Sequence, residues 1–315
     1  MNRYLHRSAP SLAALLLALA GATTAVPVGA AYVQTNLVSD IANLAAFTDP
    51  NLKNPWGIAS SATSPFWVSN NGTGTSTLYN GAGQPFPVGS PLVVTIPALP
   101  SGTPPSTPTG QVFFNGGAGF ELAPGQPARF IFATEGGTIA GWNPASSPTN
   151  ALTEVITPGA VYKGLAVGNN GSEDLLYAAN FEQAKIDVFN GSWAATTLSG
   201  SFTDPNLPAG YAPFNVQNLG GTLYVTYAKL GAGGDDISGA GFGIVDAFDL
   251  NGNLLKRVVS PGGALNSPWG LALAPAGFGE FGSALLVGNS GDGLINAFDP
   301  TTGALLGTLL DMNNN

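Results

Sequence analysis

The feature that most constrains this chain is a short motif that occurs twice, far apart in the sequence. It runs Asn54-Pro-Trp-Gly-Ile-Ala59 in the first copy and Ser267-Pro-Trp-Gly-Leu-Ala272 in the second. Short apolar runs such as Phe66–Asn70 and Ser76–Gly81 follow, separated by Gly, Pro and Asn. Apolar runs bounded by turn-forming residues predict successive antiparallel strands. The chain is therefore expected to be all-β and built from repeated units.

An aromatic residue followed by Asn or Asp marks the end of each third predicted strand. The pairs are Tyr79-Asn80, Trp142-Asn143, Phe189-Asn190, Phe248-Asp249 and Phe298-Asp299. Asn, Asp and the Gly or Pro that follow favour tight hairpins. Units of about 40 to 60 residues with this content predict the blades of a β-propeller. The predicted blades lie near 54–96, 110–157, 162–198, 213–259 and 267–310, and residues 196–198 are the expected outer strand of the third.

A longer repeat bears on the number of blades. Phe47-Thr-Asp-Pro-Asn-Leu52 precedes the first blade and Phe202-Thr-Asp-Pro-Asn-Leu207 precedes the fourth, which predicts a duplicated three-blade half. The fold is thus expected to be six-bladed by design, with about five blades present, and residues 32–38 are expected to supply an outer strand of the last blade. A closed five-blade ring is the alternative. Asp49 and Asp204 are predicted to form Asp-Pro turns.

Residues 1–30 have the features of a secretory signal peptide. Arg3 and Arg7 precede an apolar stretch from Leu12 to Ala20, and small residues follow. No later apolar run is long enough for a transmembrane segment. The sequence therefore predicts an exported protein with one propeller domain over residues 31–315, located in the periplasm, at the cell surface or outside the cell.

Composition excludes several functions. The net charge is -9, with nine basic and eighteen acidic residues, so a nucleic-acid partner is not expected. The chain has no cysteine, and its single histidine, His6, lies in the predicted signal peptide. Catalysis by Ser-His-Asp or Cys-His groups and ordinary zinc sites are therefore not expected. A metal ion would have to be one that prefers oxygen ligands, such as calcium.

These motifs resemble those of known families. Pro55-Trp-Gly-Ile-Ala59 and Trp67-Val-Ser-Asn70 are similar to NHL-type repeats. Residues 48–52, 54–59 and 66–79 further resemble a family of uncharacterised exported bacterial propeller proteins, some with a C-terminal sorting tag, and the likeness covers residues 32–311. Members of that family continue into a last blade and a tag that this sequence lacks. The resemblance implies the propeller fold and no agreed activity.

In NHL-like blades, the loop before the inner strand and the end of the second strand emerge on one face. The resemblance thus predicts a ligand-binding mouth formed by Asn54, Trp56, Asn70, Asn180, Asn215, Trp269 and Asn289, with Asn71, Glu135 and Lys163 beside them. Oxygen atoms of Glu135, Asn180 and Asn289 are candidates for a calcium site. Asn at a strand end also caps turns, and the tryptophans either stack on a sugar or aromatic ligand or pack between strands.

We therefore expect an exported module that binds a small molecule, a glycan or an extracellular protein. The first alternative is a calcium-dependent hydrolase or lactonase. Related gluconolactonase-like propellers often carry an acidic residue where this chain has Trp56 and Trp269, so their full ligand set does not transfer. The second alternative is a structural component of the cell surface or matrix.

Overall fold

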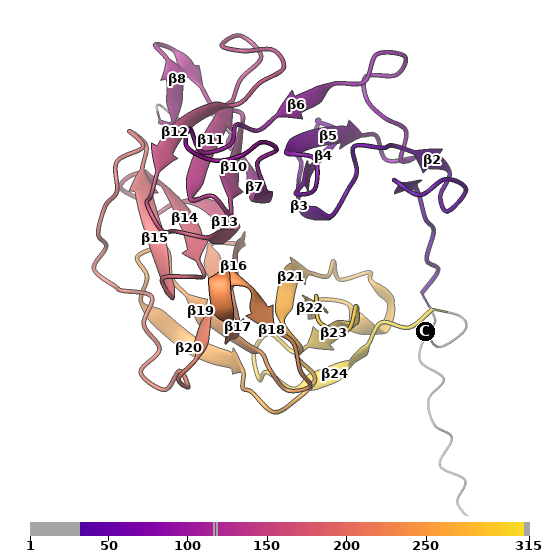
Figure 1. Ribbon diagram of the computed structural model, residues 1–315. Coiled ribbons are helices and arrows are strands. Elements are labelled where there is room, and N and C mark those ends of the chain that lie inside the picture. Colours follow the sequence, from indigo (N-terminus) through magenta and orange to yellow (C-terminus); the bar gives the residue numbers. More distant parts are fainter. Residues whose placement is uncertain (1–31, 116, 118, 312–315) are drawn as a thin grey trace, which may run out of the picture.

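The chain folds into small antiparallel sheets arranged around a common axis (Figure 1). The structure is a computed structural model that describes residues 32–115, 117 and 119–311, so the predicted signal peptide lies outside the described residues. Within these ranges, no helix has the length and apolar character needed to cross a membrane. The prediction of an all-β propeller is confirmed, and the described residues form five blades.

Strands follow one another outward from the axis in each blade. Blade 1 consists of β3 (Pro55–Ala59), β4 (Phe66–Asn70), β5 (Thr75–Tyr79) and β6 (Val93–Thr95). Blade 2 consists of β7 (Pro108–Phe113), β10 (Phe130–Thr134), β11 (Thr138–Trp142) and β12 (Leu152–Ile156). A hairpin of β8 (Glu121–Ala123) and β9 (Gln126–Pro127) is inserted in blade 2.

The remaining blades follow the same order. Blade 3 consists of β13 (Tyr162–Asn169), β14 (Asp174–Asn180) and β15 (Lys185–Asn190). Blade 4 consists of β16 (Tyr211–Leu219), β17 (Thr222–Leu230), β19 (Ile244–Phe248) and β20 (Leu254–Val259), and β18 (Asp236–Ile237) pairs with β17. Blade 5 consists of β21 (Pro268–Leu273), β22 (Leu285–Asn289), β23 (Ile295–Phe298) and β24 (Leu305–Thr308).

Two strands expected from the sequence are not formed. Residues 196–198 do not add an outer strand to blade 3, because only Thr196 N–H bonds to Val188 and the chain then turns away. Residues 32–38 are not a strand either. Tyr32 alone bridges to Asp311, and β1 (Val38–Ser39) pairs in parallel with β2 (Phe47–Thr48). Among the described residues there is no sixth blade for this segment to join.

Apolar side chains fill the four spaces between successive blades. Trp67 of blade 1 stacks on Phe130 of blade 2 with ring centroids 4.1 Å apart. Four of the five aromatic residues that end the third strands lie in these clusters, as Phe189 does between blades 2 and 3 and Phe248 between blades 3 and 4. Alternation along each strand makes both faces of a blade apolar, so every blade needs a neighbour on each side.

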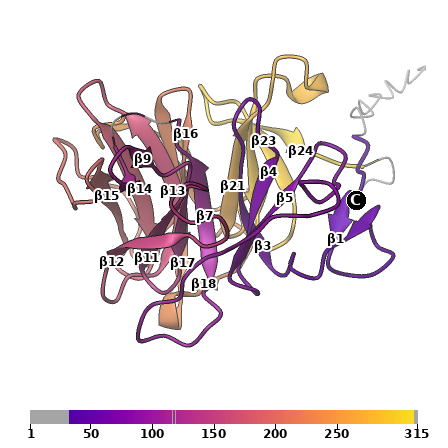
Figure 2. The same cartoon turned by 90° about the horizontal axis from the view of Figure 1, so that it is seen from above.

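Blades 1 and 5 are neighbours around the axis, as Figures 1 and 2 show, but among the described residues no buried apolar cluster fills the space between their faces. Trp56 and Trp269 meet across this space at one end, where both pack against Phe214.

Other facing positions of blades 1 and 5 are exposed. Ile58 of blade 1 is 61% exposed, and Ile295 of blade 5 is 42% exposed. In the other interfaces, residues on the same strands of the blade are buried, as Leu165 is on the inner strand β13 and Ile139 is on the third strand β11. The space between blades 1 and 5 is thus an opening with apolar walls.

The duplicated segments form the same turn twice. The backbone N–H of Asn51 bonds to Asp49 Oδ1 at 2.9 Å, and that of Asn206 bonds to Asp204 Oδ1 at 2.8 Å. Both aspartates are buried, and each also ties its turn to a blade. Asp49 accepts a hydrogen bond from the Tyr79 hydroxyl, and Asp204 forms an ion pair with Arg257. Asp49 and Asp204 therefore act as turn formers, as their sequence predicts.

Inner strands approach one another through glycine. A Cβ atom added to Gly57 of β3 would lie 2.6 Å from the Thr109 carbonyl oxygen at β7, and one added to Gly110 would lie 2.5 Å from the Leu165 nitrogen of β13. Gly270 of β21 differs, because a Cβ there would meet only Gly288 of its own blade, at 3.7 Å. The glycines thus let the inner strands of blades 1 and 2 approach the next blade closely, whereas β16 of blade 4 contains no glycine.

We expect Gly110→Ala to lower the free energy of unfolding by about 1 to 3 kcal/mol, because the added methyl group would push β13 away from β7. Gly270→Ala is the matched control and should change it by less than about 0.5 kcal/mol. Urea unfolding of both variants measures the difference. Equal losses in the two variants would contradict this account of inner-strand packing.

A buried charge cluster lies beside blade 4. The Asp246 side chain has no exposed surface, and Arg257 Nε lies 3.4 Å from its Oδ1 while the same guanidinium pairs with Asp204. Asp246 Oδ2 has no hydrogen-bond partner among the described residues. Burial, followed by the charge of Asp204, raises the pKa of Asp246 to about 7 despite the opposing effect of Arg257. The folded state therefore favours the protonated carboxyl.

Stability should consequently fall as the pH rises. Because the pKa of Asp246 is higher in the folded chain than its usual value of 3.8, its stabilising contribution is complete below about pH 4 and is lost as the pH passes through about 7. Asp246→Asn should remove this loss, so the variant should gain on the order of 2 kcal/mol relative to wild type between pH 4.5 and 7.5. Urea unfolding at both pH values tests this. A constant difference between the two proteins would show that Asp246 does not titrate as described.

Candidate functional site: a cleft between the first and last blades

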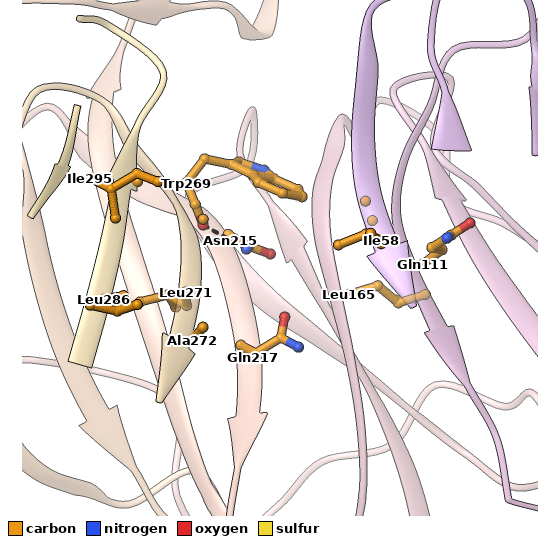
Figure 3. A pocket seen from close by; sticks show the side chains of 14 residues that line it. Ile58, Gln111, Leu165, Asn215, Gln217, Trp269, Leu271, Ala272, Leu286 and Ile295 are labelled. Carbon is orange, nitrogen blue, oxygen red and sulfur yellow. Dashed lines mark hydrogen bonds between the residues drawn. The ribbon is translucent and has the colours of Figure 1, made fainter. Parts of the chain in front are cut away.

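A cavity of about 290 Å³ lies at the axis and extends between blades 5 and 1 (Figure 3). Ile58 forms one wall, and Leu271, Leu286 and Ile295 form the other. Amide side chains of Asn215 and Gln217 line its axial side. Gln111 also borders the cavity, but its amide points away and bonds to blade 1. None of the residues that line it is charged. The cavity therefore suits a ligand that is neutral and at least partly apolar.

A second cavity of about 310 Å³ continues from the first. It is lined by Trp56 and Trp269 together with Asn54, Pro55, Asn289 and Ser290, and it shares Trp269, Gly270 and Gly288 with the first cavity. We call the second cavity the aromatic compartment and the first the apolar compartment. Together they form one cleft, whose two halves differ in the side chains they present.

The Pro-Trp-Gly motif, which occurs in both β3 and β21, explains the aromatic compartment. Asn54 and Ser267 both have positive φ values, 49° and 46°, immediately before a proline. This conformation turns the chain into the inner strand at the same point in both copies, and the tryptophan then follows. The rings of Trp56 and Trp269 meet edge to face, with centroids 5.5 Å apart. Both tryptophans are half-buried, so they pack against Phe214 and its neighbours and also border the cleft.

Hydrogen bonds hold Trp269 in place from two blades. Its indole N–H donates to the Lys163 carbonyl oxygen at 2.9 Å, and its own carbonyl oxygen accepts from Asn215 Nδ2 at 2.7 Å. Asn215 Oδ1 also accepts from the Val216 N–H. The Trp269 ring is therefore fixed in orientation before any ligand binds, which lowers the entropic cost of binding.

A charged network supports Trp56. Lys163 is 3% exposed, pairs with Glu135, and places its ammonium group 5.3 Å from the centroid of the Trp56 ring. Asn71 donates to Glu135 Oε2 at 3.0 Å, and Asn54 donates to Asn71 Oδ1 at 3.1 Å. These side chains come from blades 1, 2 and 3. Their network joins three blades at the end of the axis where the tryptophans lie.

Three of the predicted asparagines are engaged in their own hairpins. Asn70 donates to Thr75 and Thr77, and Asn180 donates to Gln183 and Asp187; neither asparagine has exposed surface. Asn289 donates to the Ala264 carbonyl oxygen and borders the aromatic compartment. The expected ring of exposed asparagines is therefore not formed by Asn70 and Asn180. The turn-capping alternative describes these two side chains.

The candidate calcium ligands do not contact one another among the described residues. Glu135 pairs with Lys163, while the amides of Asn180 and Asn289 bond within their own blades. Asn289 Oδ1 has no hydrogen-bond partner in the described part of the chain. Within residues 32–115, 117 and 119–311, no group of three or more Asp, Glu, His or Cys side chains is arranged to hold a metal ion. Calcium binding stays a prediction.

Sequence reasoning missed Gln217 and the apolar walls. Gln217 lies on the inner strand β16 and forms no side-chain hydrogen bond within the described residues, which leaves its amide free to meet a ligand. Gln111, by contrast, accepts from Ser69 and Ser76. Nothing in the sequence of β16 sets Gln217 apart from the other residues of an inner strand. The apolar walls gave no sign, because Ile58 and Ile295 resemble ordinary interface residues.

The fold and this cleft define a β-propeller, and comparisons with known proteins agree. A chain in the crystal structure of a nidogen/laminin complex superposes on this protein with a TM-score of 0.53 and 10% identity. The match covers 84% of this chain and 82% of the matched chain. Virginiamycin B lyase from Staphylococcus aureus gives a TM-score of 0.52 and 14% identity, covering 84% of this chain and 74% of the lyase. At these identities the likeness shows the fold alone.

Sequence relatives identify the family. Uncharacterised protein R648 of Acanthamoeba polyphaga mimivirus is 37% identical over 288 residues, which are 87% of this chain and 68% of that protein. Uncharacterised protein L690 of the same virus is 36% identical over 291 residues, 88% of this chain and 73% of that protein. The chain belongs to the family of these viral proteins. No family model matches it. These relatives are viral, so they do not support the expected membership of an exported bacterial family.

The Lys163–Glu135 pair offers a test of the network. After Glu135→Ala, the one remaining carboxylate near the buried Lys163 ammonium among the described residues would be Asp235, which is 86% exposed and 3.9 Å away. We expect it to lower the free energy of unfolding by about 2 to 4 kcal/mol. Adding Lys163→Met should recover most of that loss, because no buried charge then remains unpaired. Urea unfolding of the single and double variants measures the coupling, and additive losses would contradict it.

Proposed function

We propose that the protein is an exported β-propeller that binds a neutral small molecule or glycan in the cleft between blades 1 and 5. The observation that carries this proposal is the pair of half-buried tryptophans, Trp56 and Trp269, held edge to face beside an uncharged cavity. A flat sugar face or an aromatic ring stacks on such a surface with useful affinity. Export is proposed from the predicted signal peptide.

Rigidity of the aromatic compartment supports a binding role. Trp269 is held by blades 3 and 4 through its indole and carbonyl groups, and Trp56 is held by Lys163 and Phe214. Gln217 presents an amide group that forms no side-chain hydrogen bond within the described residues. A preformed site with apolar walls and a few polar groups is the usual form of a small-molecule site.

Other functions have less support. A propeller of similar fold comes from a nidogen and laminin complex, so a protein partner is consistent with the fold. Another propeller of similar fold is virginiamycin B lyase, so a catalytic role is also consistent with the fold. The calcium-dependent hydrolase has no observation of this kind in its favour, because Glu135 is engaged with Lys163 and Asn71. Fold similarity does not decide between these functions.

Tryptophan fluorescence tests the proposal. Titration with phenyl β-glucoside and with a panel of neutral saccharides should give a saturable change in emission for at least one compound. Trp269→Ala should weaken that binding at least about tenfold, because the stacking surface is lost. Trp269→Phe, which retains an aromatic ring, should weaken it less.

Trp193→Phe provides the matched control. Trp193 packs on Phe120 in the space between blades 2 and 3, away from the cleft, so its loss should leave the affinity unchanged. Thermal unfolding of each variant confirms that it is folded. If no compound binds, or if Trp269→Ala binds as tightly as wild type, the tryptophan pair is not the binding surface.

A further inference from the structure

The cleft has a second half that stacking on the tryptophans does not use. The apolar compartment continues from the aromatic one toward the axis and outward between the blades, with Ile58 on one side and Leu286 and Ile295 on the other (Figure 3). Its walls are faces that the other four interfaces bury completely. Exposed apolar surface of this kind is unfavourable in water, and covering it lowers the free energy of the system.

The junction between the two compartments is open. It is formed by Gly270 and Gly288, which lack side chains, and a Cβ atom on either would have only the other glycine within contact distance, at 3.7 Å. Any larger side chain at these positions would project into open space. A single ligand is therefore able to occupy both compartments at once.

Charge and polarity further define such a ligand. No lining residue of either compartment is ionisable. Of the charged groups beside the cleft, Glu135 and Lys163 pair with each other, and Asp292 accepts hydrogen bonds from Asn289 and Asn266. A charged ligand group would lose its hydration here without gaining an opposite charge. The amide group of Gln217, which forms no side-chain hydrogen bond within the described residues, is available to neutral hydroxyl or carbonyl groups.

We propose that the cleft binds a neutral amphiphile, with a sugar-like head on Trp56 and Trp269 and an alkyl or acyl chain between Ile58 of blade 1 and Leu286 and Ile295 of blade 5. This inference rests on the proposed function for its head group and adds the chain. A cavity with two opposed apolar walls suits a linear chain, which buries apolar surface on both sides.

Three probes separate the parts of the ligand in calorimetric titrations. Octyl β-glucoside, used below its micellar concentration, has the neutral head and the chain. Methyl β-glucoside has the head alone, and octanoate has a similar chain with a charged head. We expect octyl β-glucoside to bind at least about 30-fold more tightly than either of the others, because its chain is buried without a charge being buried.

Two substitutions locate the chain. Ile295→Asn should reduce the affinity for octyl β-glucoside about tenfold or more and leave methyl β-glucoside unchanged. Gly288→Val should close the junction and lower the affinity for octyl β-glucoside to that for methyl β-glucoside. The matched control is Ile156→Asn, since Ile156 is 48% exposed on the outer strand of blade 2 and Ile295 is 42% exposed. This control should bind both glucosides as wild type does.

The outcomes distinguish this inference from the proposed function. If both glucosides bind equally and Trp269→Ala weakens both, the tryptophan site stands and the alkyl chain is overturned. If octyl β-glucoside binds Ile295→Asn and Gly288→Val as tightly as wild type, it binds outside the cleft and the alkyl-chain site is overturned. The same conclusion follows if octanoate binds as tightly as octyl β-glucoside. A dimer in gel filtration that Ile295→Asn dissociates would instead show that a second copy covers these walls. A third result would separate the two claims the other way. If Ile295→Asn and Gly288→Val abolish the preference for octyl β-glucoside over methyl β-glucoside, and Trp269→Ala changes neither affinity, the chain site is supported and stacking of the head group on tryptophan is refuted.

Discussion

Direct contact between the backbones of neighbouring inner strands is the constraint on which the rest of this structure depends. Gly57, Gly110 and Gly164 each lie where a Cβ atom would collide with the next inner strand. Because these positions are glycine, the inner strands come close enough for the blade faces farther out to enclose Trp67, Ile131 and their neighbours. Burial of those apolar clusters then supplies most of the stabilisation.

The cleft follows from the same constraint. Gly270 occupies the equivalent place in blade 5, yet no following inner strand packs on it, so the faces of blades 5 and 1 remain apart. Alternation along the strands still makes those faces apolar, which leaves Ile58 and Ile295 exposed. The opening is therefore lined by apolar side chains of the kind that fill the other interblade spaces, but no facing blade covers them among the described residues. Trp56 and Trp269 lie at its axial end.

Polar side chains around the axis divide into two groups according to their hydrogen bonds. Asn70, Asn180 and Lys163 are buried, and burial without partners would be costly, so their partners are supplied by the same or an adjacent blade. Gln217 borders the cavity and has no such partner among the described residues. Asn70, Asn180 and Lys163 therefore have structural roles, whereas Gln217 is able to hydrogen-bond to a ligand.

The sequence alone determined the all-β class, the repeated blade, the hairpins after each aromatic pair and the turns at Asp49 and Asp204, because these depend on alternation and on residues that tolerate unusual backbone angles. It also singled out Trp56 and Trp269 through the repeated motif. Only the tertiary structure decided that Asn70 and Asn180 are buried, that blade 3 lacks an outer strand, and that Ile58 faces Ile295 across a cleft. The physical reason is that a buried and an unfilled interface use the same apolar residues, so that only the presence or absence of a facing blade distinguishes them.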